Sequence, residues 1–280
     1  MNPPAIALTV DFEGGIEELP ARTTTLLALF DSFDVKATFF VLGEIAEKLP
    51  SLVREISNCG HEIGFHGYRH VPLSNLSLSC FRAELVEWRS RLECLTQRSV
   101  LGFRAPFFSL QANTVWALAQ LEEAGFRYDS SIYPGLTDRF SWRAAPQQPI
   151  RTSSGFVLFP VPVLSRALPV GFSGGGYLRL LPWLVVKWGM RRHFLQNRFG
   201  MIYVHPWEIV RPSGANRRPH RRFFAAGNSF KQRDSFRSRI GRNRTLPRLH
   251  KLLTTYRSHV RPMGEIVATM SDLNVWKPNL

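Results

Sequence analysis

Cysteine is scarce in this chain of 280 residues, and its spacing excludes two common kinds of site. Cys59, Cys80 and Cys94 include no Cys-x-x-Cys pair of the kind that binds zinc, and three cysteines do not make the even set of a disulfide framework. We therefore expect a reducing compartment, in which each cysteine is a small buried apolar residue.

Long apolar runs are also missing, which argues against a membrane-spanning helix. The start of the chain lacks the charged leader and apolar core of a signal peptide. The apolar stretch 178–190 is interrupted by Arg179, Pro182 and Lys187 and is too short to cross a bilayer. It either lies in a membrane interface or covers the core. These features predict a cytoplasmic protein, with peripheral contact to the inner face of the membrane as an option.

Acidic residues are rare in one part of the chain. The net charge is +15, and 211–244 alone holds 11 Lys/Arg and a single acid, Asp234. This segment contains several Pro and Gly residues and no clean periodicity, which is typical of a long loop or extension. It is either a solvated loop or a contact for an anionic membrane or lipid-phosphate carrier. Nucleic acid is not expected as a partner, because no nucleic-acid motif accompanies the charge.

The rest of the chain has an ordinary globular composition, with 44% hydrophobic and 20% charged residues. Strand and helix patterns alternate through the first two thirds, which predicts parallel strands with helices packed outside. We expect one barrel-like domain over 1–210, the basic loop 211–244, and a helical segment and tail, 245–280, that belong to the same domain. The expected strands are 6–10, 36–42, 62–65, 100–103, 126–128, 157–159 and 201–204, and the expected helices are 23–33, 44–58, 78–95 and 113–124.

Polar residues follow the expected strands at equivalent places. Asp11, His66, Arg104, Asp129 and His205 each come directly after a strand. In a parallel barrel, the carboxyl ends of the strands converge at one face, and such folds build their active sites there. The sequence therefore predicts that these five side chains share a site.

Two short motifs suggest metal chemistry. Asp11 and Glu13 alternate at a strand end and face the same side, where their repulsion favours a bound cation or a shifted pKa. A solvated strand end is the alternative. His66 and His70 are four residues apart and can share a metal if the segment turns helically, although a chance pair has the same spacing.

Three further residues have the properties of supporting groups. Arg104 can hold a carboxylate in a bidentate fork. His205 can donate a proton near neutral pH, although a structural histidine is the alternative. Asp129 either orients that histidine or forms a turn or helix N-cap.

Taken in order, these motifs resemble a known family. The pieces Asp11-Phe-Glu13, His66-Gly-Tyr-Arg-His70, Arg104-Ala-Pro-Phe107, Asp129-Ser-Ser and Val-His205-Pro are similar to the successive motifs of the NodB-homology polysaccharide deacetylases, carbohydrate esterase family four. The elements 174–177 and 205–208 are similar to the subgroup associated with exopolysaccharide gene clusters. The resemblance covers residues 5–210 and resumes weakly around 236–266.

The resemblance implies an irregular (β/α) barrel, with seven strands expected, and a metal-dependent hydrolase. Glu13, His66 and His70 would hold a divalent metal, usually zinc. Metal-bound water would attack the amide carbonyl of an N-acetylated amino sugar in a polysaccharide or a lipid-linked glycan precursor. Asp11 would act as the base, held by Arg104. His205 would act as the acid, oriented by Asp129.

Two positions depart from the family pattern, and two rival functions stay open. Glu13 stands where the family most often has Asp, and Phe107 stands where many members have Tyr. Relatives that open cyclic imides and ureides share the barrel and an Asp-x-Glu motif. A non-catalytic glycan- or membrane-binding protein is the third reading, and the intact set of site residues argues against it.

Overall fold

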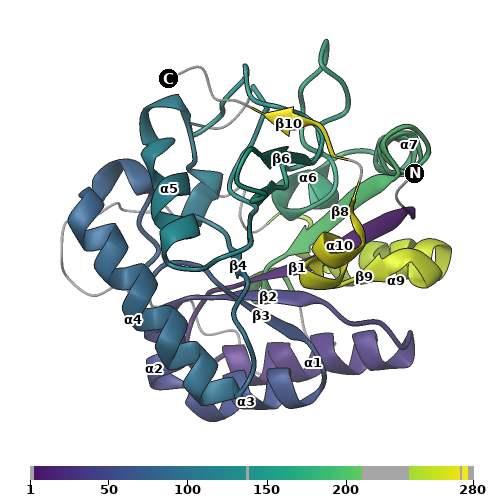
Figure 1. The fold of residues 1–280 in the computed structure, drawn as a ribbon. Helices are drawn as coiled ribbons and strands as arrows, with labels where there is room; N and C mark the ends of the chain where they lie inside the picture. The colour runs from purple at the N-terminus through teal and green to yellow at the C-terminus, as the bar shows by residue number, and fades with distance from the viewer. Residues whose placement is uncertain (1–2, 137–138, 210–239, 272, 277–280) are drawn as a thin grey trace.

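The computed structural model describes residues 3–136, 139–209, 240–271 and 273–276 as an α/β fold (Figure 1). Its strands form one curled, mixed sheet in the order β10-β6-β7-β5-β4-β3-β2-β1-β8, with β9 paired to β1. The sheet forms a half-barrel, and the α/β prediction is confirmed. The strands are β1 Ala5–Phe12, β2 Thr38–Val41, β3 Glu62–Phe65, β4 Gly102–Phe103, β5 Tyr128–Asp129, β6 Ile150–Thr152, β7 Val157–Leu158, β8 Phe199–Val204, β9 Val260–Arg261 and β10 Val275–Trp276.

Helices cover the outside of the sheet, as the alternating pattern predicts. Helices α1 to α5 belong to the first half of the chain, and α4 and α5 lie on the opposite side of the molecule from α7 and α9 (Figure 1). The end of α1 reaches α9, where the rings of Phe33 and His250 are 4.9 Å apart. The helices are α1 Leu19–Ser32, α2 Gly43–Lys48, α3 Pro50–Asn58, α4 Leu78–Thr96, α5 Trp116–Glu123, α6 Gly175–Leu180, α7 Trp183–Asn197, α9 Thr245–Tyr256 and α10 Met263–Thr269.

Strand β1 is buried along its whole length. All eight of its residues are buried, because β2 and β8 pair with it in parallel on its two sides. The chain therefore brings a strand from near residue 200 directly beside its first strand. This arrangement places the residues after β8 next to those at the end of β1.

The number of strands differs from the expected seven. Ten strands are present in the described part of the sheet, and β6 runs antiparallel to β7. The additional strands β6, β9 and β10 have only two or three residues each. Such short strands carry no alternating pattern, so the sequence gives no sign of them. Strand β9 pairs with β1, and β10 pairs with β6.

Two local expectations need correction, and a third falls mostly outside the described residues. The helix expected over 44–58 is two helices, α2 and α3, and Pro50 opens the second because proline suits a first helical turn. The three cysteines are exposed rather than buried. Most of the basic segment 211–244 lies outside the described residues.

The apolar stretch 178–190 is divided between α6 and α7. Helix α7 buries Val186, Gly189, Met190 and His193 against the core, so one face of this helix does cover the core. Within the described ranges, no helix is long and apolar enough to cross a membrane.

Candidate functional site

A cavity of about 200 Å³ lies where the carboxyl ends of β1, β3 and β8 meet. The aligned registers of these parallel strands bring together residues that are far apart in the chain. Five of its lining residues belong to the predicted site: Asp11, Glu13, His66, His70 and His205. Aromatic residues and glycines make up the rest of the wall: Phe107, Phe108, Tyr133, Gly175, Gly176, Tyr177, Tyr203 and Trp207.

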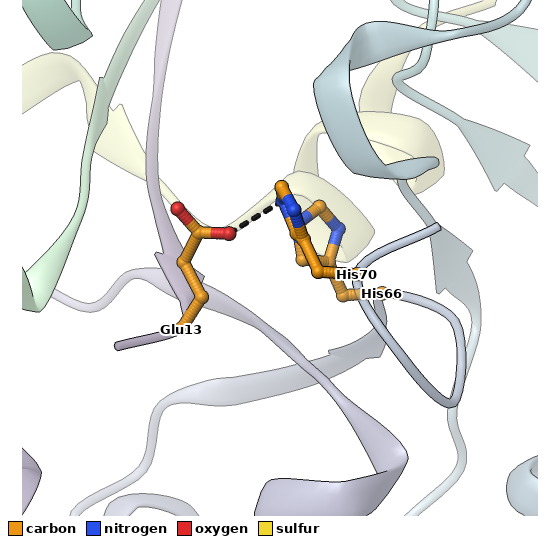
Figure 2. Close-up of side chains that lie close together, drawn as sticks. All are labelled: Glu13, His66 and His70. Carbon is orange, nitrogen blue, oxygen red and sulfur yellow. Dashed lines mark ion pairs between the residues drawn. The ribbon is translucent and has the colours of Figure 1, made fainter. Parts of the chain in front are cut away.

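Glu13, His66 and His70 form a cluster with the donor set of a metal site. One potential ligand atom from each lies within 4.8 Å of the other two (Figure 2). Glu13 Oε2 is 2.5 Å from His70 Nε2, and Trp207 Nε1 donates to Glu13 Oε1 at 2.9 Å. Burial would raise the pKa of Glu13, but the neighbouring histidines, His70 first, outweigh it and hold the pKa well below its usual value. Glu13 is therefore an anion directed at two imidazoles.

The ring of His66 is held in a tautomer that suits metal binding. Its Nδ1 lies 2.6 Å from the carbonyl oxygen of Arg104, which can only accept a hydrogen bond. Nδ1 therefore carries the proton, and Nε2 keeps a free lone pair. Burial is the main reason that the pKa of His66 falls to about 4, so the ring is neutral near neutral pH, as a ligand must be.

Asp11 and Arg104 form a buried ion pair beside this cluster. Arg104 Nη1 donates to Asp11 Oδ1 at 2.6 Å and to the Thr9 hydroxyl at 2.9 Å. Its other nitrogens donate to the carbonyl and hydroxyl oxygens of Ser130. Burial would raise the pKa of Asp11, but Arg104 and the nearby His66 and His205 lower it overall. The carboxylate is thus ionised, and its Oδ2 lies 3.6 Å from His205 Nε2.

His205 is held by Glu208, which lies one turn further along. Glu208 Oε2 is 3.0 Å from His205 Nδ1 and accepts the backbone N–H of His205 at 3.0 Å. Burial lowers the pKa of His205, but Glu208, with Glu13 and Asp11, raises it to about 9. Glu208 is fully buried, and its Oε1 is 2.8 Å from Arg179 Nε of α6. The imidazole therefore presents a protonated Nε2 to the cavity.

Asp129 does not make the contact expected of it. Its carboxylate accepts the backbone N–H of Ser131 at 2.9 Å and the Ser131 hydroxyl, which in turn accepts the N–H of Ala105. This is the turn-forming alternative, because an aspartate readily bonds to the backbone two residues on. Burial raises the pKa of Asp129 to about 7. The resemblance implies the orienting role for Asp129, and in the structure Glu208 makes the contact with His205 Nδ1.

The remaining wall of the cavity is aromatic. Trp207 stacks on His205 with ring centroids 5.0 Å apart, and the hydroxyl of Tyr133 donates to that of Tyr177 at 2.8 Å. Phe107 contacts His70, with centroids 4.2 Å apart, from a backbone with a φ of 61°. Such a φ is strained for a phenylalanine, and residues of this kind cluster at functional sites.

Sequence reasoning overlooked the roles of Glu208 and Trp207. The spacing of His205 and Glu208, with Pro206 between them, is that of a capping box on a short 3-10 helix, Pro206–Glu208. That spacing is the signal that could have placed the carboxylate on the histidine. The contact of Trp207 with Glu13 spans 194 residues of sequence and has no local signal.

Two family models match the chain. Residues 1–128 match a polysaccharide deacetylase model, and residues 130–263 match a domain of unknown function, DUF3473. The boundary falls between the two residues of β5, inside one continuous sheet. The second matched region supplies β8, His205 and Glu208, so both matched regions contribute to one site.

Curated relatives agree with the first model. A peptidoglycan-N-acetylglucosamine deacetylase of Bacillus cereus is 34% identical over 120 residues, which are 42% of this chain and 42% of the relative. A chitooligosaccharide deacetylase of Sinorhizobium fredii is 28% identical and is covered to 91%, with 64% of this chain aligned. The chain spans less than half of the length of the first three curated relatives that it matches.

Solved structures share the fold over the whole chain. A putative polysaccharide deacetylase from Mycobacterium smegmatis has a TM-score of 0.61 at 21% identity, with 100% of this chain and 96% of that chain covered. Puue allantoinase has a TM-score of 0.59 at 16% identity, with 95% and 89% covered. At these identities the likenesses show the fold alone. The family match belongs to residues 1–128, which are similar to polysaccharide deacetylases.

Proposed function

We propose that this chain hydrolyses the N-acetyl group of an amino sugar and releases acetate and a free amine. The observation that carries the proposal is the single cavity in which Asp11, Glu13, His66, His70 and His205 meet. This set offers a metal site, a base and an acid within one small space. The names of the curated relatives, which include peptidoglycan and chitooligosaccharide deacetylases, support the same reaction.

Glu13, His66 and His70 would hold the divalent metal, and zinc suits two imidazoles and one carboxylate. The fixed tautomer of His66 and the anionic Glu13 fit this role. When bound there, the metal would polarise the acyl carbonyl and lower the pKa of water. Glu13 and His70 touch at 2.5 Å, so their ligand atoms would have to separate, since donors around tetrahedral zinc lie roughly 3.3 Å apart.

Asp11 and His205 would move the protons. Asp11 is ionised and takes a proton from the attacking water, while Arg104 fixes its other oxygen. His205 stays protonated near neutral pH and gives its Nε2 proton to the departing nitrogen. Glu208 holds the opposite edge of that ring, so it is a positioning residue rather than a group that touches the substrate.

The substrate would be a finished polysaccharide or a lipid-linked glycan precursor of the kind made by exopolysaccharide gene clusters. Tyr177, from the 174–177 element, lines the cavity together with Trp207, and aromatic rings offer flat apolar surfaces to sugar rings.

The domain organisation is part of the same proposal. We include 245–280 in the same domain as 1–210, because β9 pairs with β1. The basic segment 211–244 would contact an anionic membrane or a lipid-phosphate carrier.

Metal content and acetate release test the proposal together. The purified protein should hold about one divalent ion per chain, and a His66→Ala/His70→Ala double variant should lose it. Asp11→Asn should keep the metal and lower the rate of acetate release from N-acetylated amino-sugar oligomers by about 10²–10⁴-fold, the usual range for a general base. A double variant that retains stoichiometric metal would overturn the ligand assignment.

A cyclic imide or ureide hydrolase is the second candidate. The likeness to an allantoinase extends over 95% of this chain, so the fold serves both reactions. The same purified protein should be assayed with hydantoin-like rings and with a panel of N-acetylated glycans. Ring opening without acetate release would favour this second function.

A further inference from the structure

The outer face of α7 carries exposed apolar residues at helical spacing. Leu184, Trp188 and Leu195 are 76%, 50% and 64% exposed, whereas the opposite face of the helix is packed on the core. The three lie four and seven residues apart, so they form one stripe along the helix. A stripe of this kind on a surface helix marks a contact with something apolar.

The charged residues of α7 itself are all of one sign. Lys187 and Arg191 are exposed between the apolar residues, and the Arg192 guanidinium lies 5.6 Å from the centre of the Trp188 ring. No Asp or Glu occurs anywhere in 139–207, which holds nine Lys/Arg. An apolar stripe whose own helix carries only cations is complementary to a surface that is apolar inside and anionic at its rim.

The neighbouring helix α9 extends the same basic surface. Arg248 and Lys251 of α9 lie over the ring of Trp183, at the start of α7, at 6.0 and 5.6 Å. Helices α7 and α9 lie on the opposite side of the molecule from α4 and α5 (Figure 1). Helix α9 contains no acidic residue either.

We infer that α7 docks in the interface of an anionic lipid bilayer, with Leu184, Trp188 and Leu195 among the acyl chains and Lys187 and Arg191 at the headgroups. Basic amphipathic helices with Trp and Leu on the other face bind membranes in this way. Only Leu181 and Pro182 separate α7 from α6, whose first residues line the cavity. The docked helix therefore holds the cavity close to the lipid surface, where a carrier-linked glycan is anchored. Only this last step rests on the proposed function.

Vesicle sedimentation of the full chain tests the docking. The protein should bind vesicles of equal parts phosphatidylglycerol and phosphatidylcholine, and bind phosphatidylcholine vesicles weakly. Leu184→Ser/Trp188→Ser should weaken binding at least about tenfold, because each apolar side chain contributes to partitioning. Lys187→Gln/Arg191→Gln should weaken it by about fivefold per charge on anionic vesicles and reduce its salt dependence.

The chain offers a matched control on α4. Leu78 and Val86 are also exposed, at 47% and 59%, but on the acidic half of the molecule. Leu78→Ser/Val86→Ser should bind vesicles like the wild type, and so should the inactive Asp11→Asn variant. The second comparison separates failure of the docking from failure of the proposed reaction.

Lipid quenching locates the helix directly. Brominated acyl chains should quench tryptophan fluorescence of the bound protein, and Trp188→Phe, which keeps an apolar ring, should remain bound and lose part of that quenching. Wild-type binding by the Leu184→Ser/Trp188→Ser variant would overturn the inference and place the contact elsewhere in the chain. A change from dimer to monomer in that variant, with no vesicle binding by the wild type, would instead make this face an interface between two copies.

Discussion

The two halves of this chain carry opposite charge and supply different parts of one site. Residues 1–138 hold 17 Asp/Glu and 11 Lys/Arg, whereas 139–280 hold 4 Asp/Glu and 25 Lys/Arg. The acidic half provides the proposed metal ligands, and the basic half provides His205 and Glu208. The halves follow closely the two family models, which meet at residues 128–130.

This difference shows that a sequence boundary need not be a structural one. Strand β8 of the basic half pairs with β1 of the acidic half over six registered residues. The proposed acid and base therefore lie on adjacent strands although they are 194 residues apart. Neither matched region has a complete site or a complete sheet by itself.

The largest effect should come from separating the two halves. A chain of residues 1–128 alone would leave β1 without β8, which buries all six of its own residues against its neighbours. The loss of that apolar contact and of the strand's hydrogen bonds should prevent folding. Circular dichroism and urea titration should show no cooperative unfolding transition. A cooperative transition would mean that the first matched region is an independent domain.

A smaller effect is expected from substituting Glu208, and little effect from substituting Asp129. Glu208→Gln should lower kcat/KM for deacetylation about 10–100-fold, the usual range when the partner that orients a functional histidine is lost. It should also move the alkaline limb of the pH–rate profile to lower pH, because Glu208 is the main group that raises the pKa of His205.

Asp129→Asn is the matched control, since it also removes one buried carboxylate near the site. Its rate and its pH profile should stay close to those of the wild type, because Asp129 bonds to Ser131 and not to His205. The reverse pattern would return the orienting role to Asp129.

The smallest effect concerns Glu62, which lies at the opposite end of β3 from His66 and connects the two halves. Its carboxyl accepts from Thr38, Tyr128 and the backbone of Gly264, and burial raises its pKa. The folded protein prefers the protonated carboxyl of Glu62, so this group stabilises the fold fully at a pH below its pKa in the unfolded chain, near 4.5. The stabilisation is lost as the pH rises through the higher pKa of the folded protein. Glu62→Gln should therefore raise Tm at about pH 8, by roughly 2–4 °C for each ~1 kcal/mol of lost stability that it restores, and by much less at about pH 4. An equal shift at both pH values would show that ionisation of Glu62 is not responsible.

Much of the site could be predicted because its residues share a local rule. Asp11, His66, Arg104 and His205 lie at or just after the ends of strands, and parallel strands bring such ends together. Strands β1, β2 and β8 could also be predicted, because they are buried and therefore consist of continuous apolar runs. Two-residue strands such as β4 and β5 were located only approximately, because so short a segment has no periodicity.

The sequence by itself determined the α/β class, the family resemblance and the positions of the polar residues at strand ends, because each depends on local spacing or on the order of motifs. Only the tertiary structure decided that Asp129 bonds to Ser131, that Trp207 reaches Glu13, and that one face of α7 is exposed among the described residues. Those outcomes depend on which segments pack against each other in space. Local sequence pattern does not contain that information, because the partners lie on different elements or compete for the same position.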